Sequence, residues 1–289
     1  MSEKVRIIVK RFRKGEWFHS EYEVPFKRGM TLLEALQWIK ENLDRTLAFR
    51  ANCRMGLCGS CGLTANGEPV LACETQVSSL GEEIELEPLR NFPPIRDLVV
   101  DFTPFLEKQR EVKPHLIREG KEDWSREYFQ SKEELDSYIQ FTYCISCGLC
   151  YSACPTSSLR DWLGPQALMT AYRFSADSRD SGFRERLEAV KDHLGFCHLA
   201  NSCSEVCPKG VDPSLGIQLL RRKANRFSLL GDRKRKPRGL VPPREKGEPI
   251  PYPEPTVEGA EEEISRLLNS STIKRRLGNN WPKRELSPD

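Results

Sequence analysis

The sequence predicts an α+β fold, in which a small N-terminal domain of strands and one helix precedes a domain built only of helices. Residues 4–10 and 18–24 alternate apolar and polar side chains on either side of Lys14-Gly15, a pattern that predicts a β-hairpin. After Pro93-Pro94, apolar residues recur at helical spacing, and no strand is recognisable between residues 100 and 230. Eleven cysteines are gathered in a few short runs, so the loops that carry them are expected to carry the function.

The remaining elements of the N-terminal domain, residues 1–95, follow from local signals. Thr31 is an expected N-cap for an amphipathic helix over residues 31–42. A loop with three cysteines comes next, and then two short strands joined by the turn Asn66-Gly67-Glu68. Residues 83–87 predict one more strand.

The second domain, residues 96–230, contains helix-start signals at several places. Ser131 and Glu134 form a capping box, and Pro165 stands at an early position of a helix that follows Gly164. Asp212-Pro213 opens the last helix of this domain. The expected helices cover residues near 97–109, 131–138, 164–174, 182–191 and 212–220.

Composition excludes several functional classes. The net charge of +3 is too small to indicate a nucleic-acid partner, and no run approaches the roughly 20 apolar residues of a membrane span. The first residues form a strand-like pattern and not an apolar signal core, so we expect the protein to stay in the reducing compartment where it is made. An odd number of cysteines there indicates metal ligands in preference to disulfides.

The first cysteine group has the spacing C-x4-C-x2-C, with a fourth cysteine after eleven further residues. This is the plant-type ferredoxin spacing for a [2Fe–2S] cluster, so a β-grasp domain of that type is expected. Gly56, Gly59 and Gly62 allow the close backbone approach that a cluster loop requires. A zinc knuckle is the alternative, but its paired C-x2-C units fit this spacing poorly. The predicted ligands are Cys53, Cys58, Cys61 and Cys73.

Two further runs predict that the helical domain holds two more clusters. The run from Cys144 to Pro155 reads C-x2-C-x2-C-x3-C-P, the spacing of bacterial two-cluster ferredoxins, in which the fourth cysteine ligates the other cluster. The run from Cys197 to Pro208 repeats it, except that Ala200 replaces the second cysteine. Seven thiolates are therefore available for two clusters.

If each cysteine that precedes a proline crosses to the other site, the seven thiolates divide into two sets. The first set, expected to hold a [4Fe–4S] cluster, is Cys144, Cys147, Cys150 and Cys207. The second set, expected to hold a [3Fe–4S] cluster, is Cys154, Cys197 and Cys203.

Over residues 4 to about 225 the arrangement resembles the iron–sulfur subunit of succinate dehydrogenase and fumarate reductase. The resemblance includes the motif Cys53-Arg-Met-Gly-Leu-Cys-Gly-Ser-Cys61, the dipeptide Gly164-Pro165 and the segment Cys207-Pro-Lys-Gly-Val-Asp-Pro213. All eleven cysteines fall on family positions.

The resemblance implies an electron-transfer subunit with no catalytic residue of its own. It implies two partners: a flavoprotein subunit, which holds FAD and acts on succinate or fumarate, and one or more membrane anchor subunits. It also implies a peripheral location on the cytoplasmic side of the inner membrane, attached through those anchors. A quinone would be reduced or oxidised at the interface with the anchors, near Thr156, Ser157 and His198.

One departure from the family concerns the tryptophan that often follows the Cys-Pro pair in members that act on ubiquinone. Here Cys154-Pro155 is followed by Thr, Ser, Ser and Leu, and Trp162 lies further along, where we expect it to pack at a helix entry. This difference favours a menaquinone-linked or otherwise atypical member.

The C-terminal extension, residues 231–289, exceeds what the family core needs. Residues 221–238 are strongly basic, which predicts either a solvated surface or contact with anionic lipid head groups. Prolines follow, and residues 256–277 have the apolar pattern of a helix. The extension is expected to bind a partner subunit.

Three other functions remain open from the sequence. The chain could serve a soluble fumarate reductase with a non-quinone electron donor, act as a free ferredoxin, or be a scaffold held by zinc. Free ferredoxins are short and lack the additional helices and tail, and visible absorbance would distinguish a cluster protein from a zinc protein.

Overall fold

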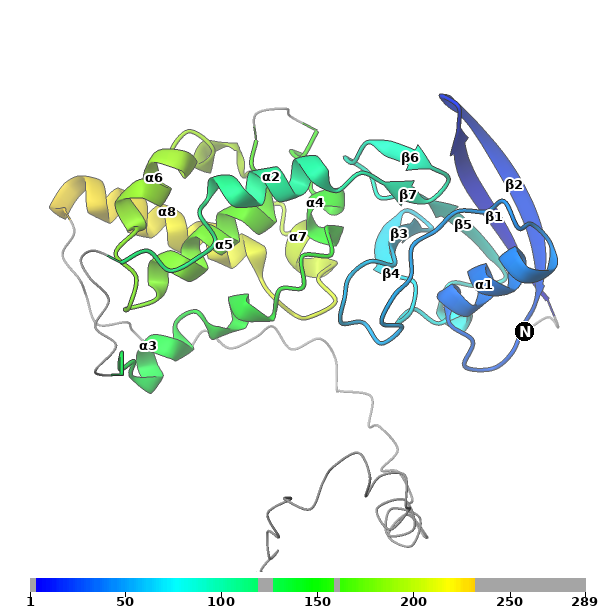
Figure 1. Ribbon diagram of the computed structural model, residues 1–289, viewed down its shortest axis with the longest axis horizontal. Coiled ribbons are helices and arrows are strands. Elements are labelled where there is room, and N and C mark those ends of the chain that lie inside the picture. Colours follow the sequence, from blue (N-terminus) through cyan, green and yellow to red (C-terminus); the bar gives the residue numbers. More distant parts are fainter. Residues whose placement is uncertain (1–3, 119–126, 159–161, 232–289) are drawn as a thin grey trace, which may run out of the picture. The chain divides into compact units, whose positions relative to one another are not determined.

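A long β-hairpin begins the fold, and its two strands lie at one side of a five-stranded sheet (Figure 1). The computed structural model describes residues 4–118, 127–158 and 162–231. The hairpin strands pair antiparallel from Lys4 opposite Pro25 to Arg13 opposite Glu16. Lys14 and Gly15 turn the chain with positive φ angles of 52° and 89°, as a two-residue hairpin loop requires.

The sheet has the strand order β2-β1-β5-β3-β4, and only the central pair, β1 with β5, is parallel. The helix α1, Leu32–Asn42, begins at Thr31, whose side chain accepts a hydrogen bond from the Glu34 N–H in a capping box. Buried side chains of α1 and of the sheet form one core, which confirms the predicted α+β domain. The strands are β1 Lys4–Arg13, β2 Glu16–Pro25, β3 Gly62–Ala65, β4 Glu68–Leu71 and β5 Glu83–Glu87.

A second, two-stranded ribbon was not expected from the sequence. It pairs β6, Pro94–Arg96, with β7, Val99–Val100, around Asp97, whose φ is 49°. The Asp97 N–H donates to the Phe12 carbonyl at 2.8 Å, which ties the ribbon to β1. The prediction of a helix from residue 97 was therefore wrong at its start, because α2 covers Thr103–Glu111.

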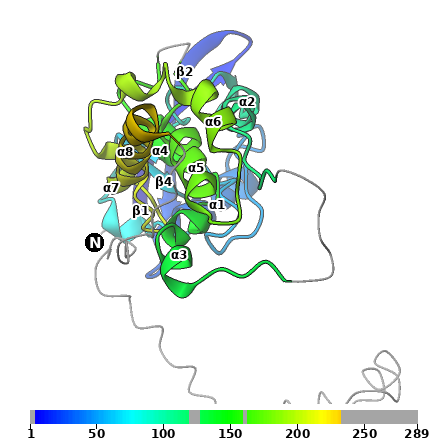
Figure 2. The same ribbon diagram turned by 90° about the vertical axis from the view of Figure 1, so that its left-hand side faces the viewer.

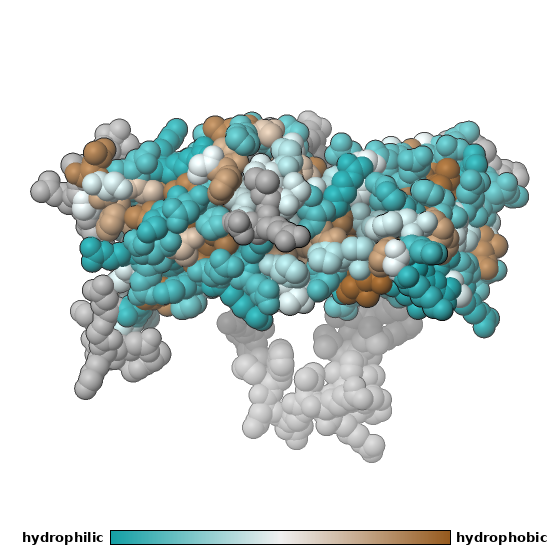
Figure 3. Space-filling view, turned by 90° about the horizontal axis from the view of Figure 1, so that it is seen from above, coloured by the Kyte–Doolittle hydropathy of each residue, from teal (hydrophilic) through white to brown (hydrophobic). Residues whose placement is uncertain are grey.

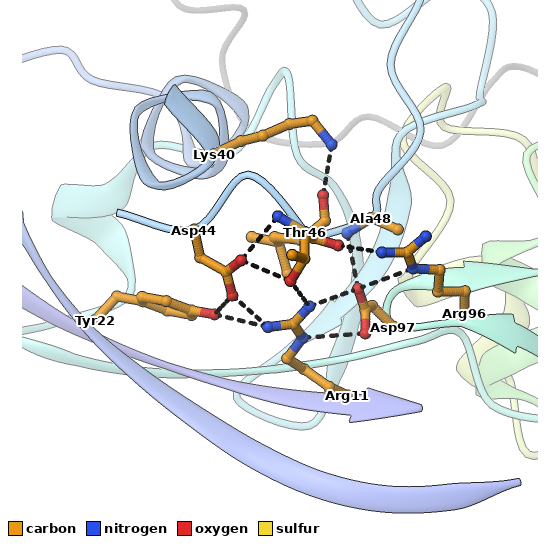
Figure 4. Close-up of polar contacts among 9 residues, drawn as sticks. Arg11, Tyr22, Lys40, Asp44, Thr46, Ala48, Arg96 and Asp97 are labelled. Carbon is orange, nitrogen blue, oxygen red and sulfur yellow. Dashed lines mark hydrogen bonds and ion pairs between the residues drawn. The ribbon is translucent and has the colours of Figure 1, made fainter. Parts of the chain in front are cut away.

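The side chain of Arg11 joins this ribbon to the loop that leads from α1 to the first cysteines (Figure 4). Its guanidinium donates two hydrogen bonds of 3.0 Å to the Asp97 carboxylate, and both side chains are nearly inaccessible to water. It also donates to Asp44 and Thr46, and Asp97 accepts from the Ala48 N–H at 2.8 Å. The loop is thus held at several points before it reaches Cys53.

The second half of the described chain is helical, and α5 packs along α8 (Figure 2). As predicted, Ser131 and Glu134 form a capping box, and Asp212 caps α8 by accepting from the Leu215 N–H at 2.9 Å. The helices are α3 Lys132–Asp136, α4 Leu149–Ala153, α5 Pro165–Ala176, α6 Phe183–Val190, α7 Ser202–Glu205 and α8 Pro213–Leu230, with 3-10 turns at Val77–Ser79, Ile139–Tyr143 and Leu194–Phe196.

Within the described residues, no helix is both long and apolar enough to cross a membrane. The face shown in Figure 3 is largely hydrophilic, and its hydrophobic residues form small separate patches of the kind common on protein surfaces. The helix predicted over residues 256–277 and the end of the basic run, residues 232–238, lie outside the described residues. The predicted domain boundaries at residues 95 and 230 stay predictions.

Candidate iron–sulfur sites

The first cysteine group lies at one end of the β3–β4 pair, because Cys61 immediately precedes β3 and Cys73 closely follows β4. The loop over residues 53–61 bends through left-handed backbone at Arg54, Gly56 and Gly59. These bends direct backbone N–H groups at sulfur. Cys53 Sγ accepts from the Leu57 and Cys58 N–H groups at 3.3 and 3.2 Å, and Cys73 Sγ accepts from the Gly56 N–H at 3.3 Å.

The four thiols of this group do not share one protonation behaviour. A hydrogen bond with Ser60, whose Oγ is 3.0 Å away, lowers the pKa of Cys58 to about 6. Burial raises the pKa of Cys61 to about 12, and its sulfur lies 3.3 Å from that of Cys73. Metal loading must therefore displace a proton from Cys61, whereas Cys58 is mainly thiolate at neutral pH.

A second group of cysteines surrounds a cavity between α4, α5 and the segment after α7. Three of them come from the run at 144–150, and the fourth, Cys207, comes from the other run. Gly148, with φ 78°, begins α4 and turns the chain between Cys147 and Cys150. The cavity is lined by Cys144, Cys147, Cys150 and Cys207, together with Gln166, Met169 and Lys209 among others.

The remaining three cysteines line a separate cavity with Ala200. Leu199 and Asn201, with φ angles of 58° and 62°, turn the backbone on either side of this alanine. The two cavities are similar in size, so size does not distinguish them. Their sulfur ligands do distinguish them, since the cavity with Ala200 has three cysteines: Cys154, Cys197 and Cys203.

The donor sets fit multinuclear clusters better than single ions. All eleven cysteines are free thiols. Burial raises the pKa of Cys147 and Cys203 to about 12 and raises that of Cys150 well above its usual range, so their thiolate forms need a neutralising cation. In the described part of the chain, no three His, Cys, Asp or Glu side chains are placed to hold one metal ion. The sulfurs instead surround spaces that a cluster could fill.

Of the three side chains expected near a quinone, two line the cavity of the third cysteine group and one does not. Thr156, which is buried, and His198, which is exposed, both line the cavity of the third cysteine group. Ser157 does not line it, and its buried hydroxyl has no hydrogen-bond partner within the described part of the chain. Trp162 is 1% exposed and donates from Nε1 to the His193 carbonyl at 3.2 Å, so it packs as expected, with an edge on the same cavity.

Direct contacts connect the three groups in order. A Cβ added to Gly59 would lie 2.7 Å from Cys147 Cβ, so the first loop touches a cysteine of the second group. Glu74, next to Cys73, pairs with Lys209 at 3.0 Å. The short helix α4 carries Cys150, and Cys154 directly follows its end, so one helical turn joins the second and third groups.

Sequence reasoning did not identify Glu74, Lys209 or Gln166 as parts of these sites. Glu74 and Lys209 each lie close to a predicted ligand, but no local pattern pairs two residues that are 135 positions apart. Gln166 was an ordinary polar residue of a predicted helix, and only the packing of α5 brings it to the second cavity.

Comparison with known proteins shows that the chain matches two families of iron–sulfur domains. Residues 5–107 match the family of 2Fe-2S iron-sulfur cluster binding domains, and residues 140–211 match that of 4Fe-4S dicluster domains. The fumarate reductase iron–sulfur subunit of Mycobacterium tuberculosis is 47% identical over 215 residues, which cover 72% of this chain and 86% of the relative. That of Escherichia coli is 43% identical over 200 residues, covering 68% and 82%.

Succinate dehydrogenase proteins are also similar. The iron–sulfur subunit from Coxiella burnetii is 38% identical over 205 residues, covering 70% of this chain and 86% of the relative. A chain in the solved Mycobacterium smegmatis Sdh1 complex in the apo form superimposes with a TM-score of 0.70 at 27% identity, covering 79% of this chain and 98% of that one. The resemblance inferred from the cysteine motifs is confirmed: the protein belongs to the family of iron–sulfur subunits of fumarate reductase and succinate dehydrogenase.

Proposed function

We propose that this chain relays electrons between a FAD-containing flavoprotein subunit and a quinone, through one [2Fe–2S], one [4Fe–4S] and one [3Fe–4S] cluster. When bound, such clusters supply one-electron carriers whose potentials depend on cluster type, charge and hydrogen bonds to sulfur. The residues of this chain supply the cluster ligands, set the order of the three sites and exclude water from them.

The single observation that carries the proposal is the division of the seven thiols in the helical part. Cys207 lines a cavity with Cys144, Cys147 and Cys150, whereas Cys154 lines the other with Cys197 and Cys203. This exchange between the two runs is the arrangement that two-cluster ferredoxin spacing requires. Four sulfurs in one cavity suit a [4Fe–4S] cluster, and three sulfurs beside an alanine suit a [3Fe–4S] cluster.

The contacts between the sites support a single order of the three groups along the electron path, with the second group between the first and the third. The first and second groups meet where Gly59 touches Cys147, and the second and third meet at α4. Cys61, Cys73, Cys147 and Leu149 belong to one buried core, so the first junction is packed like a protein interior. We infer that the flavoprotein subunit exchanges electrons at the first group and the quinone at the third.

The third cavity also has the chemistry that a quinone needs. Quinone reduction consumes protons, and His198 is an exposed imidazole that lines this cavity, a side chain of the kind that serves as a general acid. A quinone dissolved in the membrane must meet this face, so we propose that anchor subunits hold the chain on the cytoplasmic side of the inner membrane. The family name leaves the physiological direction open between succinate oxidation and fumarate reduction.

The test compares two electron acceptors in the purified complex. His198→Ala should slow electron transfer from succinate to a quinone analogue about 10²-fold or more, the typical contribution of a positioned acid or base. Reduction of a water-soluble dye that accepts electrons at the flavin should be unchanged. His19→Ala, on the exposed face of β2, is the matched control. Equal rates with both acceptors in His198→Ala would reject this role for His198.

A further inference from the structure

Gln166 is a buried polar residue that faces the second cysteine cavity. It lies in the first turn of α5 and is 1% exposed. It lines the cavity with Cys144, Cys147, Cys150 and Cys207. Among the described residues that line this cavity, Lys209 is the charged one, and it is paired with Glu74.

The hydrogen bonds of the Gln166 amide are incomplete. Nε2 makes one long contact, 3.4 Å, to the Thr170 hydroxyl one turn further along α5, and Oε1 has no hydrogen-bond partner among the described residues. Burial raises the pKa of the Cys144 thiol, and the nearby Gln166 side chain acts in the opposite direction. Buried polar side chains are almost always fully paired, so this amide needs an explanation.

The chemistry of the cavity provides one. An amide presents two N–H donors on one side and a carbonyl acceptor on the other. The Thr170 hydroxyl can donate or accept, so it can satisfy either end of the amide. Thiolate and sulfide sulfurs are only acceptors. With an anionic group in the cavity, the lowest-energy arrangement directs the N–H groups to sulfur and leaves the Gln166 carbonyl to accept from Thr170.

We propose that Gln166 donates a hydrogen bond to sulfur of the [4Fe–4S] centre, at Cys144 or at the cluster itself, and thereby raises the reduction potential of that centre. The inference rests on the proposed function, because it takes the second cavity as the four-iron site. Reduction adds negative charge to the cluster, and an N–H donor stabilises the more negative state more strongly. Gln166 thus makes reduction of the [4Fe–4S] centre, the middle one of the three sites, more favourable.

The first test is a redox titration of the holoprotein followed by EPR. Gln166→Met keeps a similar volume but removes the donor, so the midpoint potential of the four-iron centre should shift to a lower value while those of the other two centres stay unchanged. Met169→Leu is the matched control, because Met169 lines the same cavity, is equally buried and donates no hydrogen bond. An unchanged potential in Gln166→Met, or an equal shift in Met169→Leu, would overturn the proposal.

A second measurement does not depend on the folding of any variant. Wild-type protein labelled with ¹⁵N in glutamine side chains should show a ¹⁵N coupling to the reduced four-iron centre by pulsed EPR. Absence of that coupling would also overturn the proposal. Failure of the proposed function looks different, because the protein would then lack the four-iron signal itself.

Discussion

Ala200 distinguishes two sites that are otherwise built alike. Each cavity is lined by cysteines from both runs, and the two cavities are similar in size, but the second has four cysteines and the third has three. The position that would supply a fourth thiolate to the third group holds a methyl group, with left-handed residues on both sides fixing the loop. The proposed difference in iron number between the second and third sites therefore depends on this single side chain.

Restoring the missing ligand should change the third cluster. Ala200→Cys is expected to allow a fourth iron to bind there and to lower the potential of the site, because an additional thiolate stabilises the oxidised state. Iron content should rise by about one per chain, and the three-iron EPR signal of the oxidised protein should disappear. Ala200→Val, which adds volume without a ligand, should keep that signal. If Ala200→Cys also keeps it unchanged, the crossed ligand assignment is wrong.

Arg11 is the residue whose loss should most weaken the first domain. Arg11→Met leaves the fully buried Asp97 carboxylate without its bidentate partner, and breaking such a pair typically costs about 3–5 kcal/mol. We expect [2Fe–2S] absorbance to be lost at a clearly lower urea concentration.

Arg96→Met supplies the control for Arg11. Arg96 also approaches Asp97, at 3.9 Å, but its side chain is 44% exposed, so its loss should cost at most about 1 kcal/mol. Equal urea midpoints for the two variants would show that the buried pair does not hold the cysteine loop.

The elements that carry the cysteines are short, and their arrangement depends on contacts between distant segments. The loop over residues 53–61 presses against the segment before α4, and Asn91 Nδ2 donates to the carbonyls of Tyr151, Ser152 and Cys154 at the end of α4. The N-terminal domain thus fixes the helix that joins the second and third sites. Relative motion, the default between domains, is restricted here by packing.

Additional side-chain volume at the contact between Gly59 and Cys147 should disturb that contact without removing a cluster ligand. Gly59→Ala adds a Cβ 2.7 Å from Cys147 Cβ and 2.8 Å from its Cα, and overpacking of this kind costs about 1–3 kcal/mol in addition to left-handed backbone strain. We expect weaker magnetic interaction between the first two centres, measured by the spin relaxation of the reduced [2Fe–2S] signal.

Gly29→Ala is the matched control for the junction. Gly29 has a similar φ of 79°, but an added Cβ would meet nothing within 4 Å. This variant should carry only the strain of a left-handed residue, about 1–2 kcal/mol, and leave the relaxation unchanged. Identical relaxation in Gly59→Ala and the wild type would contradict the proposed contact.

At the scale of the whole molecule, the parts that could be predicted from the sequence are those fixed locally. The hairpin turn at Lys14-Gly15 and the caps at Thr31 and Ser131 depend on residues within a few positions of one another. Ligand spacing is informative because a cluster needs several thiolates from a short loop.

The features that could not be predicted from the sequence depend on contacts between residues that are far apart in the chain. The strands β6 and β7 have only three and two residues, and the Asp97–Phe12 hydrogen bond anchors them to β1. The Gly59–Cys147 contact and the Glu74–Lys209 pair join segments with no shared pattern. Gln166 has no distinguishing local signal, since its role follows from the packing of α5 against the cysteine loops.

The central claim is that one chain holds three clusters of different type, and a Mössbauer spectrum of anaerobically prepared, ⁵⁷Fe-labelled protein tests it most directly. We predict about nine irons per chain, divided two to four to three among [2Fe–2S], [4Fe–4S] and [3Fe–4S] components. EPR of the same sample should show a three-iron signal when oxidised and a [2Fe–2S] signal when reduced. Stoichiometric zinc, or eight or more irons all in four-iron clusters, would contradict the account.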